Sequence, residues 1–325
     1  MTTNDLDARW VQLSELGETF TCYSAAIATW AAFEREDWRS AIDPGLTLKV
    51  FPAGDGLFGF VHFPAGLRRD LQLVRSGPHS PGSQAVEAVL AELERCGRAI
   101  VAGDGFRLPW HVAHGRHHVP HWYVLGGTPD RLVVSDPFAC RNELGTQHAT
   151  RTEIARDDLG EVLVGLPGGD PVFELRERLA FGDDCPPPPG GSCHWFVRAA
   201  VEDLRVPAGA EGPDAVSELA NGIRERGQDP GAYAQADDVW SIARHRAFLA
   251  TATGAKAAQS GDGALADWVR EQAEPLAKRW AHMAPLLMQA RLSLAAGRPA
   301  SASVPDTLEE LSERERTAAR TLPVN

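Results

Sequence analysis

The stretch "HWYVLGGTPDRLVVSD", residues 121–136, carries the clearest structural signal in the chain. Two β-prone runs flank the breaker "TPD", a pattern typical of a β-hairpin. A turn centred between Thr128 and Pro129 would place His121 directly opposite Asp136, with their Cβ atoms about 5 Å apart. The sequence therefore predicts an imidazole and a carboxylate as neighbours on one face of a sheet.

A carboxylate that accepts from one imidazole nitrogen leaves the other nitrogen to act on a nucleophile. The candidate nucleophile is Cys22, within "TCYSAAIATWAAF" (21–33), where the Ala-rich pattern predicts a helix over 22–37. Thr19 or Thr21 would cap this helix and leave Cys22 in its first turn, where unpaired amides and the helix dipole favour a thiolate. Taken alone, such a cysteine is more often a buried structural thiol. Both interpretations stay open at this point.

The chain changes character along its length, from alternating helical and extended patterns to a mostly helical remainder. We expect an α+β domain with an antiparallel sheet over 1–150 and a mixed, then mainly helical, domain over 151–325, with the boundary between 150 and 190. The breaker "GDDCPPPPGG" (182–191) is expected to be a linker or an exposed loop. Helices are predicted at 84–96, 213–227, 236–253, 263–294 and 307–321, and strands at 98–104, within 45–66 and within 161–175.

Composition excludes several classes of partner. The 325 residues include 32 Lys+Arg and 44 Asp+Glu, a formal charge of -12, whereas nucleic-acid binders carry a basic excess. We expect no nucleic-acid partner. No apolar run is long enough for a membrane span and the first residues do not resemble a signal peptide, so no membrane association is expected. Five irregularly spaced cysteines favour reduced thiols in the cytoplasm.

Other clusters have simpler explanations. Five histidines crowd the segment 111–121, but the segment is broken by prolines and offers no carboxylate or thiol, so we expect a solvated or acceptor-binding loop and no metal. Cys193 beside Cys185 resembles half a metal site, yet no second half follows, and linker thiols are expected. The run "ARHRAF" (243–248) is expected to form a solvated basic face.

Four motifs support a resemblance to a known family: "TCYSAAIATW" around Cys22, "GDGLFGFVHF" (54–63), "GDGFRLPW" (103–110) and "HWYVLGGTPDRLVVSDPF" (121–138). Together they resemble the butirosin biosynthesis protein H family of papain-like acyltransferases and, more distantly, the peptidases that trim bacteriocin leaders. The resemblance covers roughly residues 10–140 by motif and the rest by size and helical character. Thr21 departs from the family, which commonly has His before the nucleophile.

The resemblance implies a papain-like catalytic domain followed by a helical domain. Cys22 would take an acyl group from a phosphopantetheine thioester on an acyl carrier protein and pass it to a small-molecule amine in specialised-metabolite biosynthesis, such as that of an antibiotic. His121 would deprotonate the thiol and then the amine, and Asp136 would fix the His tautomer. No cofactor is implied beyond the phosphopantetheine carried by the donor.

The resemblance also suggests Asp104, Trp110 and Trp122 for the substrate pocket, although Asp104 alone resembles a plain strand end. The basic run 243–248 or the pair Arg68-Arg69 would dock an acidic carrier protein. Alternative functions remain, because the triad activates only the first half-reaction. Water as acceptor gives a thioesterase or amidase, an internal nucleophile gives a cyclase, and a protein that keeps the fold without the chemistry is a binding or scaffold protein.

Overall fold

The computed structural model describes residues 3–42, 45–54, 56–61, 71–75, 83–181, 190–199 and 208–323. They combine helices with antiparallel sheets, which confirms the α+β class. Contacts divide the chain into two compact units. Unit 1 comprises Met1–Ile42 and Ala65–Arg205, and unit 2 comprises Asp43–Pro64 and Val206–Asn325.

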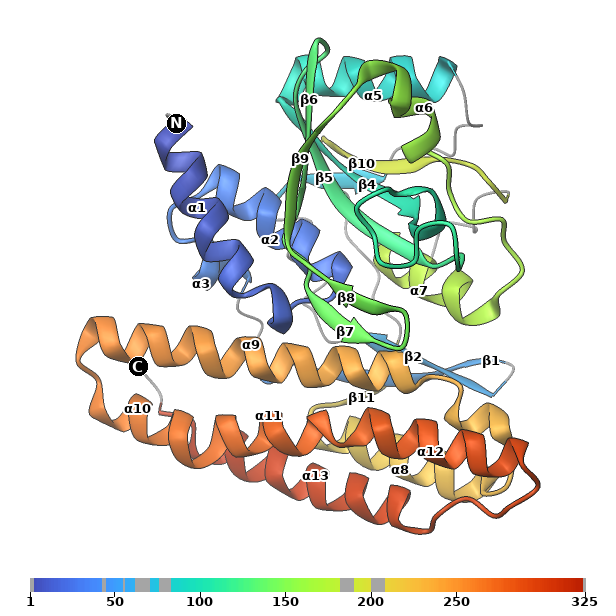
Figure 1. Ribbon diagram of the computed structural model, residues 1–325. Helices are drawn as coiled ribbons and strands as arrows, with labels where there is room; N and C mark the ends of the chain where they lie inside the picture. The colour runs from blue at the N-terminus through green and yellow to red at the C-terminus, as the bar shows by residue number, and fades with distance from the viewer. Residues whose placement is uncertain are drawn as a thin grey trace. The chain divides into compact units, whose positions relative to one another are not determined.

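Unit 1 is built on a six-stranded antiparallel sheet in the order β3-β10-β4-β5-β6-β9 (Figure 1). Its strands are β3 (Leu73–Arg75), β4 (Arg98–Asp104), β5 (Pro120–Thr128), β6 (Arg131–Asp136), β9 (Thr150–Ile154) and β10 (His194–Arg198), and a separate ribbon consists of β7 (Cys140–Asn142) and β8 (Gly145–Gln147). Its helices are α1 (Thr3–Glu15), α2 (Cys22–Glu34), α3 (Trp38–Ile42), α5 (Ser83–Cys96), α6 (Leu159–Val162) and α7 (Pro171–Phe181), with single turns η1 (Gly17–Thr19), η2 (Gly105–Arg107) and η3 (Arg156–Asp158).

The main sheet lies between two helices. Successive side chains of a strand point to opposite faces, so each face of the sheet presents its own set of side chains to a helix. One face carries Val101 and Tyr123, which share a hydrophobic cluster with Val89 of α5. The other face carries Trp122, whose ring meets the ring of Tyr23 from α2 with centroids 5.2 Å apart. Figure 1 shows α2 and α5 on opposite sides of the sheet.

The hairpin and the helix predicted near the site are confirmed, whereas the strands predicted further along the chain are wrong. The hairpin expected at 121–136 is β5 and β6, and the helix expected at 84–96 is α5. The strands expected within 161–175 are wrong, since this segment contains the end of α6 and the start of α7. Asp170 accepts hydrogen bonds from the first amides of α7, and Pro171 fits the first helical position, so this sequence starts a helix.

Unit 1 extends beyond the boundary expected between 150 and 190, because β10 is an inner strand of its sheet. It pairs with β4 on one side and β3 on the other. Cys193, just before β10, is fully buried, and burial raises the pKa of its thiol to about 12. Cys193 is therefore a core residue and not the expected linker thiol, while Cys185 lies outside the described residues.

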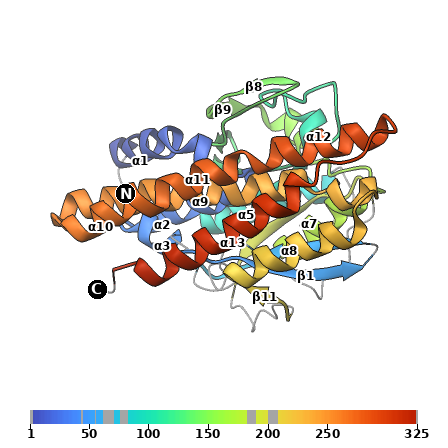
Figure 2. The ribbon, with the colours of Figure 1, turned by 90° about the horizontal axis from the view of Figure 1, so that it is seen from below.

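Unit 2 combines a three-stranded sheet with a set of long helices. The strands are β1 (Lys49–Gly54), β2 (Leu57–Val61) and β11 (Ala210–Glu211), in the order β11-β1-β2. The helices are α8 (Pro213–Arg226), α9 (Ala236–Ser260), α10 (Gly263–Trp268), α11 (Glu274–Ala281), α12 (Met283–Ala295) and α13 (Ser303–Thr321), with a 3-10 turn, η4 (Pro230–Tyr233), and a π-helical turn, η5 (Val269–Ala273). Figure 2 shows α13 running beside α8 and α11 beside α9.

The hairpin of β1 and β2 belongs to unit 2, although the sequence placed it in the N-terminal domain. Val50 and Phe58 lie in one hydrophobic core with residues of α8 and α9. The side-chain amide of Gln235 accepts from the Phe58 amide at 2.7 Å and donates to its carbonyl at 2.7 Å. These contacts join the early hairpin to helices that begin about 150 residues later in the sequence.

The run 243–248 is not the solvated basic face that its composition suggests. Arg246 is 1% exposed, and its Nε donates to Glu315 Oε1 at 2.7 Å. Trp280 Nε1 donates to the same oxygen at 2.8 Å. The Arg246 guanidinium also reaches the carbonyl of Thr47 at 3.4 Å. The buried ion pair and its neighbours link four parts of unit 2, and the burial of Arg246 removes the basis for carrier docking at this residue.

None of the helices within the described ranges is long and apolar enough to cross a membrane.

We predict that Glu315→Gln destabilises the protein by about 3–5 kcal/mol, because it leaves the Arg246 charge buried without a counter-ion. Urea denaturation of the full chain measures this change. Glu309→Gln is the matched control on the same helix, since the Glu309–Arg224 pair is about half exposed and should change stability by less than about 1 kcal/mol. Equal effects of the two variants would contradict the prediction.

Candidate active site

Cys22 is the first residue of α2, and the turn before it is fixed by a capping box. Thr21 Oγ1 accepts from the Ser24 amide at 3.1 Å, and the Thr21 amide donates to Ser24 Oγ at 2.8 Å. Thr21 is therefore the cap, whereas Thr19 ends the preceding 3-10 turn. The Cys22 sulfur thus lies at the positive end of a 13-residue helix.

The chain just before Cys22 is attached to the segment that follows β6. The Ala139 amide donates to the Gly17 carbonyl at 3.2 Å. A side chain at position 17 would overlap the carbonyl oxygen of Pro137, so only glycine permits this approach. The contact holds the entry to α2 beside the chain that leaves Asp136.

His121 and Asp136 form a buried pair, with His121 Nε2 and Asp136 Oδ2 2.7 Å apart. The side chains are 1% and 0% exposed. The predicted register, however, is wrong. Thr128 pairs with Arg131 and Val124 with Ser135. The turn is therefore centred between Pro129 and Asp130, one residue later than predicted, and each residue of β6 pairs two positions away from the predicted partner.

Extending the observed register by one residue places Asp136 opposite Tyr123, which makes His121 and Asp136 diagonal neighbours and not directly opposed residues. A shift of two positions keeps both side chains on the same face, because the side-chain period of a strand is two. Diagonal neighbours also remain within reach of a long side chain. The predicted contact therefore forms through a different register.

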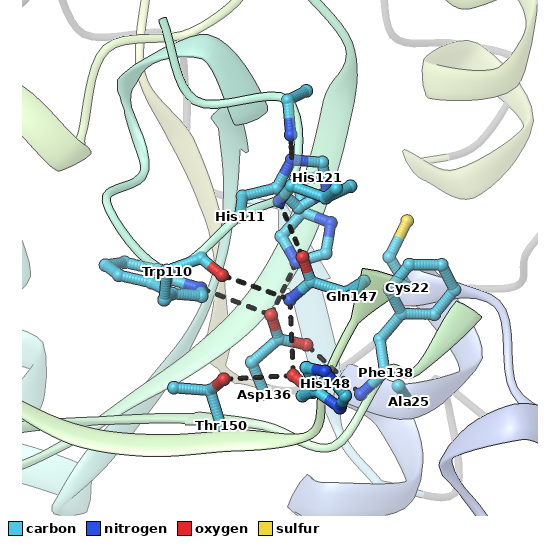
Figure 3. A network of polar contacts seen from close by, with 12 residues as sticks. Cys22, Ala25, Trp110, His111, His121, Asp136, Phe138, Gln147, His148 and Thr150 are labelled. Atoms are coloured by element: carbon cyan, nitrogen blue, oxygen red, sulfur yellow. Dashed lines mark hydrogen bonds and ion pairs between the residues drawn. The ribbon is translucent and has the colours of Figure 1, made fainter. Parts of the chain in front are cut away.

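Asp136 is held by three hydrogen-bond donors from three segments (Figure 3). Besides His121, Trp110 Nε1 donates to Oδ2 at 3.2 Å and the Phe138 amide donates to Oδ1 at 3.2 Å. A buried carboxylate needs such partners to stay charged. Trp110, expected in the substrate pocket, instead orients the carboxylate and packs edge-on against Tyr123.

The environment of His121 favours its charged form. Burial alone would lower the pKa of His121, but the negative charge of Asp136, the hydrogen bond to Asp136 and the interaction with Cys22 outweigh it and raise the pKa to about 10. The Cys22 sulfur also lies 3.9 Å from the carbonyl oxygen of Pro120, the residue before His121. The structure therefore brings together all three residues of the predicted triad, with the ring between the sulfur and the carboxylate (Figure 3).

The other two expected pocket residues lie elsewhere. Trp122 is 4% exposed and stacks on Phe196, with centroids 5.6 Å apart, so it is a core residue on the α2 face of the sheet. Asp104 is 1% exposed, caps η2 through the Phe106 amide and pairs with His118. Asp104, Trp110 and Trp122 therefore each contact different parts of unit 1, and their role in a substrate pocket stays a prediction.

His111 is part of the site in a way that the sequence did not reveal. Its ring packs against the ring of His121 with centroids 4.2 Å apart. Burial, followed by the charge of His121, lowers the pKa of His111 to about 2, so the ring is neutral. Its Nδ1 accepts from the Ala113 amide at 3.2 Å. His111 thus gives the imidazolium of His121 an uncharged neighbour.

Gln147 of β8 holds the loop that carries these groups. It is 1% exposed, and its Oε1 accepts from the Val112 amide at 2.7 Å, while its Nε2 donates to the Trp110 carbonyl at 3.4 Å. The sequence gives no signal for this role, because a single glutamine in a turn-rich stretch has no periodicity to place it. Figure 3 shows Gln147 between the loop and Asp136.

The histidines of the loop do not converge on one point. His111 faces His121 and His118 faces Asp104, whereas His114 and His117 are exposed. Within the part of the chain that the structure describes, no three His, Cys, Asp or Glu side chains are arranged to hold a metal ion.

Comparison with known proteins gives no further assignment: no family model matches this chain, and no curated protein matches it.

We predict that the His121 ring stays protonated through neutral pH and loses its proton near pH 10. The pKa is raised in the folded state, so this ring's contribution to stability is complete below about pH 6.5 and is lost as the pH rises toward 10. NMR of ring nitrogens measures the titration, with His111 as an internal control that stays neutral. In Asp136→Asn, burial should dominate and leave His121 neutral at pH 7. Titration of wild-type His121 near pH 6.5 would contradict this account.

We also predict that Gly105→Ala destabilises the protein by about 1–3 kcal/mol. A Cβ at this position would lie 2.7 Å from His111 Nδ1 and 2.7 Å from Val119 Cγ2, so the rings of His111 and His121 must shift. Thermal unfolding gives the stability, and the His121 signals report the shift. Gly115→Ala is a control for the loop, where no atom lies within 4 Å of the added carbon. That glycine has a φ of +66°, so its variant should cost stability without moving the His121 signals.

Proposed function

We propose that this protein is a cysteine-dependent acyltransferase with a papain-like catalytic unit. The observation that carries the proposal is the order Cys22, His121, Asp136 in space: a sulfur at a helix N-terminus, an imidazole next to it and a buried carboxylate behind the imidazole. This arrangement supplies an activated thiol, a proton carrier and an orienting group. The resemblance of four motifs to the butirosin biosynthesis protein H family supports the hypothesis that the reaction is an acyl transfer.

The first half-reaction forms an acyl-enzyme. The Cys22 thiolate attacks the carbonyl carbon of a carrier-bound phosphopantetheine thioester, forming a new C–S bond. The C–S bond to the carrier breaks, and the carrier thiolate takes the proton held by His121. Asp136 keeps the ring in one orientation throughout. The amide of Cys22, at the start of α2, is placed to donate to the oxygen that becomes negative during attack.

The second half-reaction transfers the acyl group to a small-molecule amine. The amine nitrogen attacks the acyl carbon, the bond to the Cys22 sulfur breaks and an amide forms. Because amide formation from a thioester is downhill, the protein mainly has to position the amine and exclude water. Transfer to water by the same residues would make the protein a thioesterase.

We predict that incubation with acyl-carrier thioesters adds the mass of the acyl group to the protein. Intact-mass spectrometry should detect this adduct on the wild type and not on Cys22→Ala. Cys96→Ala is the matched control, because burial raises the pKa of the Cys96 thiol and its loss should leave the adduct unchanged. No adduct and no thioester turnover across a broad panel would count against an enzyme and favour a binding or scaffold protein.

A further inference from the structure

Unit 1 has a cavity that the triad does not occupy. Its volume is about 170 Å³, room for a small polar molecule or for one end of a larger one. The polar and aromatic side chains that line it are His118, Asp170, Phe173, Glu174, Ser192 and His194. They come from the histidine-rich loop, the start of α7 and the start of β10.

One residue of this lining, His118, belongs to a second histidine–carboxylate pair, whose carboxylate is Asp104. His118 Nδ1 lies 2.5 Å from Asp104 Oδ2, and Asp104 Oδ1 accepts from the amides of Phe106 and Val119. The His118 ring stacks on Phe106 with centroids 4.5 Å apart. The carboxylate side chain is 2% exposed and the imidazole 49%. A buried carboxylate therefore fixes a ring whose other nitrogen, Nε2, is left to meet a ligand.

The pair lies close to the nucleophile. Asp104 is the register partner of Pro120 in the β4–β5 ladder, and the Pro120 carbonyl oxygen is 3.9 Å from the Cys22 sulfur. Ring contacts in the core also connect the cavity lining with the residue next to Cys22. The ring of His194 meets Trp122, and Trp122 meets Tyr23, the neighbour of Cys22.

The start of α7 gives the cavity its charge preference. Asp170 and Glu174 both line it, and each is fixed by a backbone amide, that of Val172 for Asp170 and that of Gly169 for Glu174. Two carboxylates in the lining favour a cation over an anion, and the Phe173 ring already meets one, the guanidinium of Arg176, 5.6 Å from its centroid. The cavity therefore suits a molecule that carries an ammonium group.

Proton counting shows what such a cavity contributes. An aliphatic amine is an ammonium ion at neutral pH, and it must lose two protons to become the N–H of a secondary amide. His121, neutral after it has protonated the carrier thiol, accepts one proton and returns to its charged form. The other proton needs a second acceptor before the nitrogen can attack.

We propose that this cavity binds the acceptor amine and that His118, held by Asp104, is the catalytic base that removes its first proton. The inference rests on the proposed acyl transfer. The ammonium proton passes to His118 Nε2, the free amine forms the C–N bond as the C–S bond to Cys22 breaks, and the second proton passes to His121. His118 then returns its proton to solvent. The two histidine–carboxylate pairs thus serve successive steps of one transfer.

The test separates the two half-reactions in the full-length protein. Acetyl-N-acetylcysteamine is the donor, 1,3-diaminopropane is the acceptor, and rapid-quench mass spectrometry follows formation and decay of acetyl-Cys22. We expect His118→Gln to form acetyl-Cys22 at the wild-type rate and to pass it to the diamine about 100-fold more slowly at pH 7. Decay with hydroxylamine, which is uncharged at this pH and needs no base to expose its lone pair, should be unchanged. His117→Gln, an exposed histidine of the same loop, is the matched control and should behave as the wild type.

Each result has one meaning. His118 is supported as the base if only transfer to the diamine is slower in His118→Gln, and if this defect shrinks as the pH rises toward the pKa of the diamine, where the amine needs no base. Equal decay in the variant and the wild type overturns the inference and leaves acyl transfer standing. Loss of acetylation in His118→Gln also overturns it, because His118 then supports the fold of the site. Absence of acetyl-Cys22 on the wild type overturns both proposals.

Discussion

The buried pair of His121 and Asp136 is the constraint on which the rest of unit 1 depends. A charged carboxylate with no exposure must be matched by donors, or it costs several kcal/mol. Asp136 meets this demand with the His121 ring, the Trp110 indole and the Phe138 amide. Those donors come from a strand, a loop and the chain after β6. One buried charge therefore fixes the relative positions of three segments and, through the contact of Gly17 with Ala139, the entry to α2 as well.

The parts of this arrangement that the sequence predicted are those fixed by local patterns. The hairpin follows from β-prone runs around a turn. The start of α2 follows from a threonine cap, for which Thr19 and Thr21 were both candidates, and the structure has Thr21. The register was wrong because "TPD" permits turns of different length, and nothing local selects among them. The predicted contact still forms, since an error of two positions preserves the face of the sheet. A prediction that two residues share a face of the sheet thus survives a register error of two positions, whereas a prediction of their exact pairing does not.

The features that the sequence did not predict depend on contacts between distant segments of the chain. Gln147 has no pattern around it, yet it is buried and holds the loop of Trp110 and Val112. Arg246 stands in a basic run that resembles a solvated surface, but Glu315, 69 residues away, makes it a buried residue. The β1–β2 hairpin gave no sign that its core partners lie in α8 and α9. In each case a side chain's role was set by its partner in space, which periodicity does not specify.

Three histidines within eleven residues of chain illustrate how such partners divide chemical roles. His121 faces a buried carboxylate and a cysteine, and its raised pKa keeps it charged. His111 faces that charge without a carboxylate of its own, and its lowered pKa keeps it neutral. His118 faces a carboxylate but is half exposed at a cavity, so its ring is accessible to a molecule bound there. The three imidazoles thus differ in charge and in accessibility, and the difference lies in burial and in the nearest carboxylate. In the proposed acyl transfer the acceptor amine loses two protons, and His121 takes only one of them, so the proposal assigns the other to a second histidine.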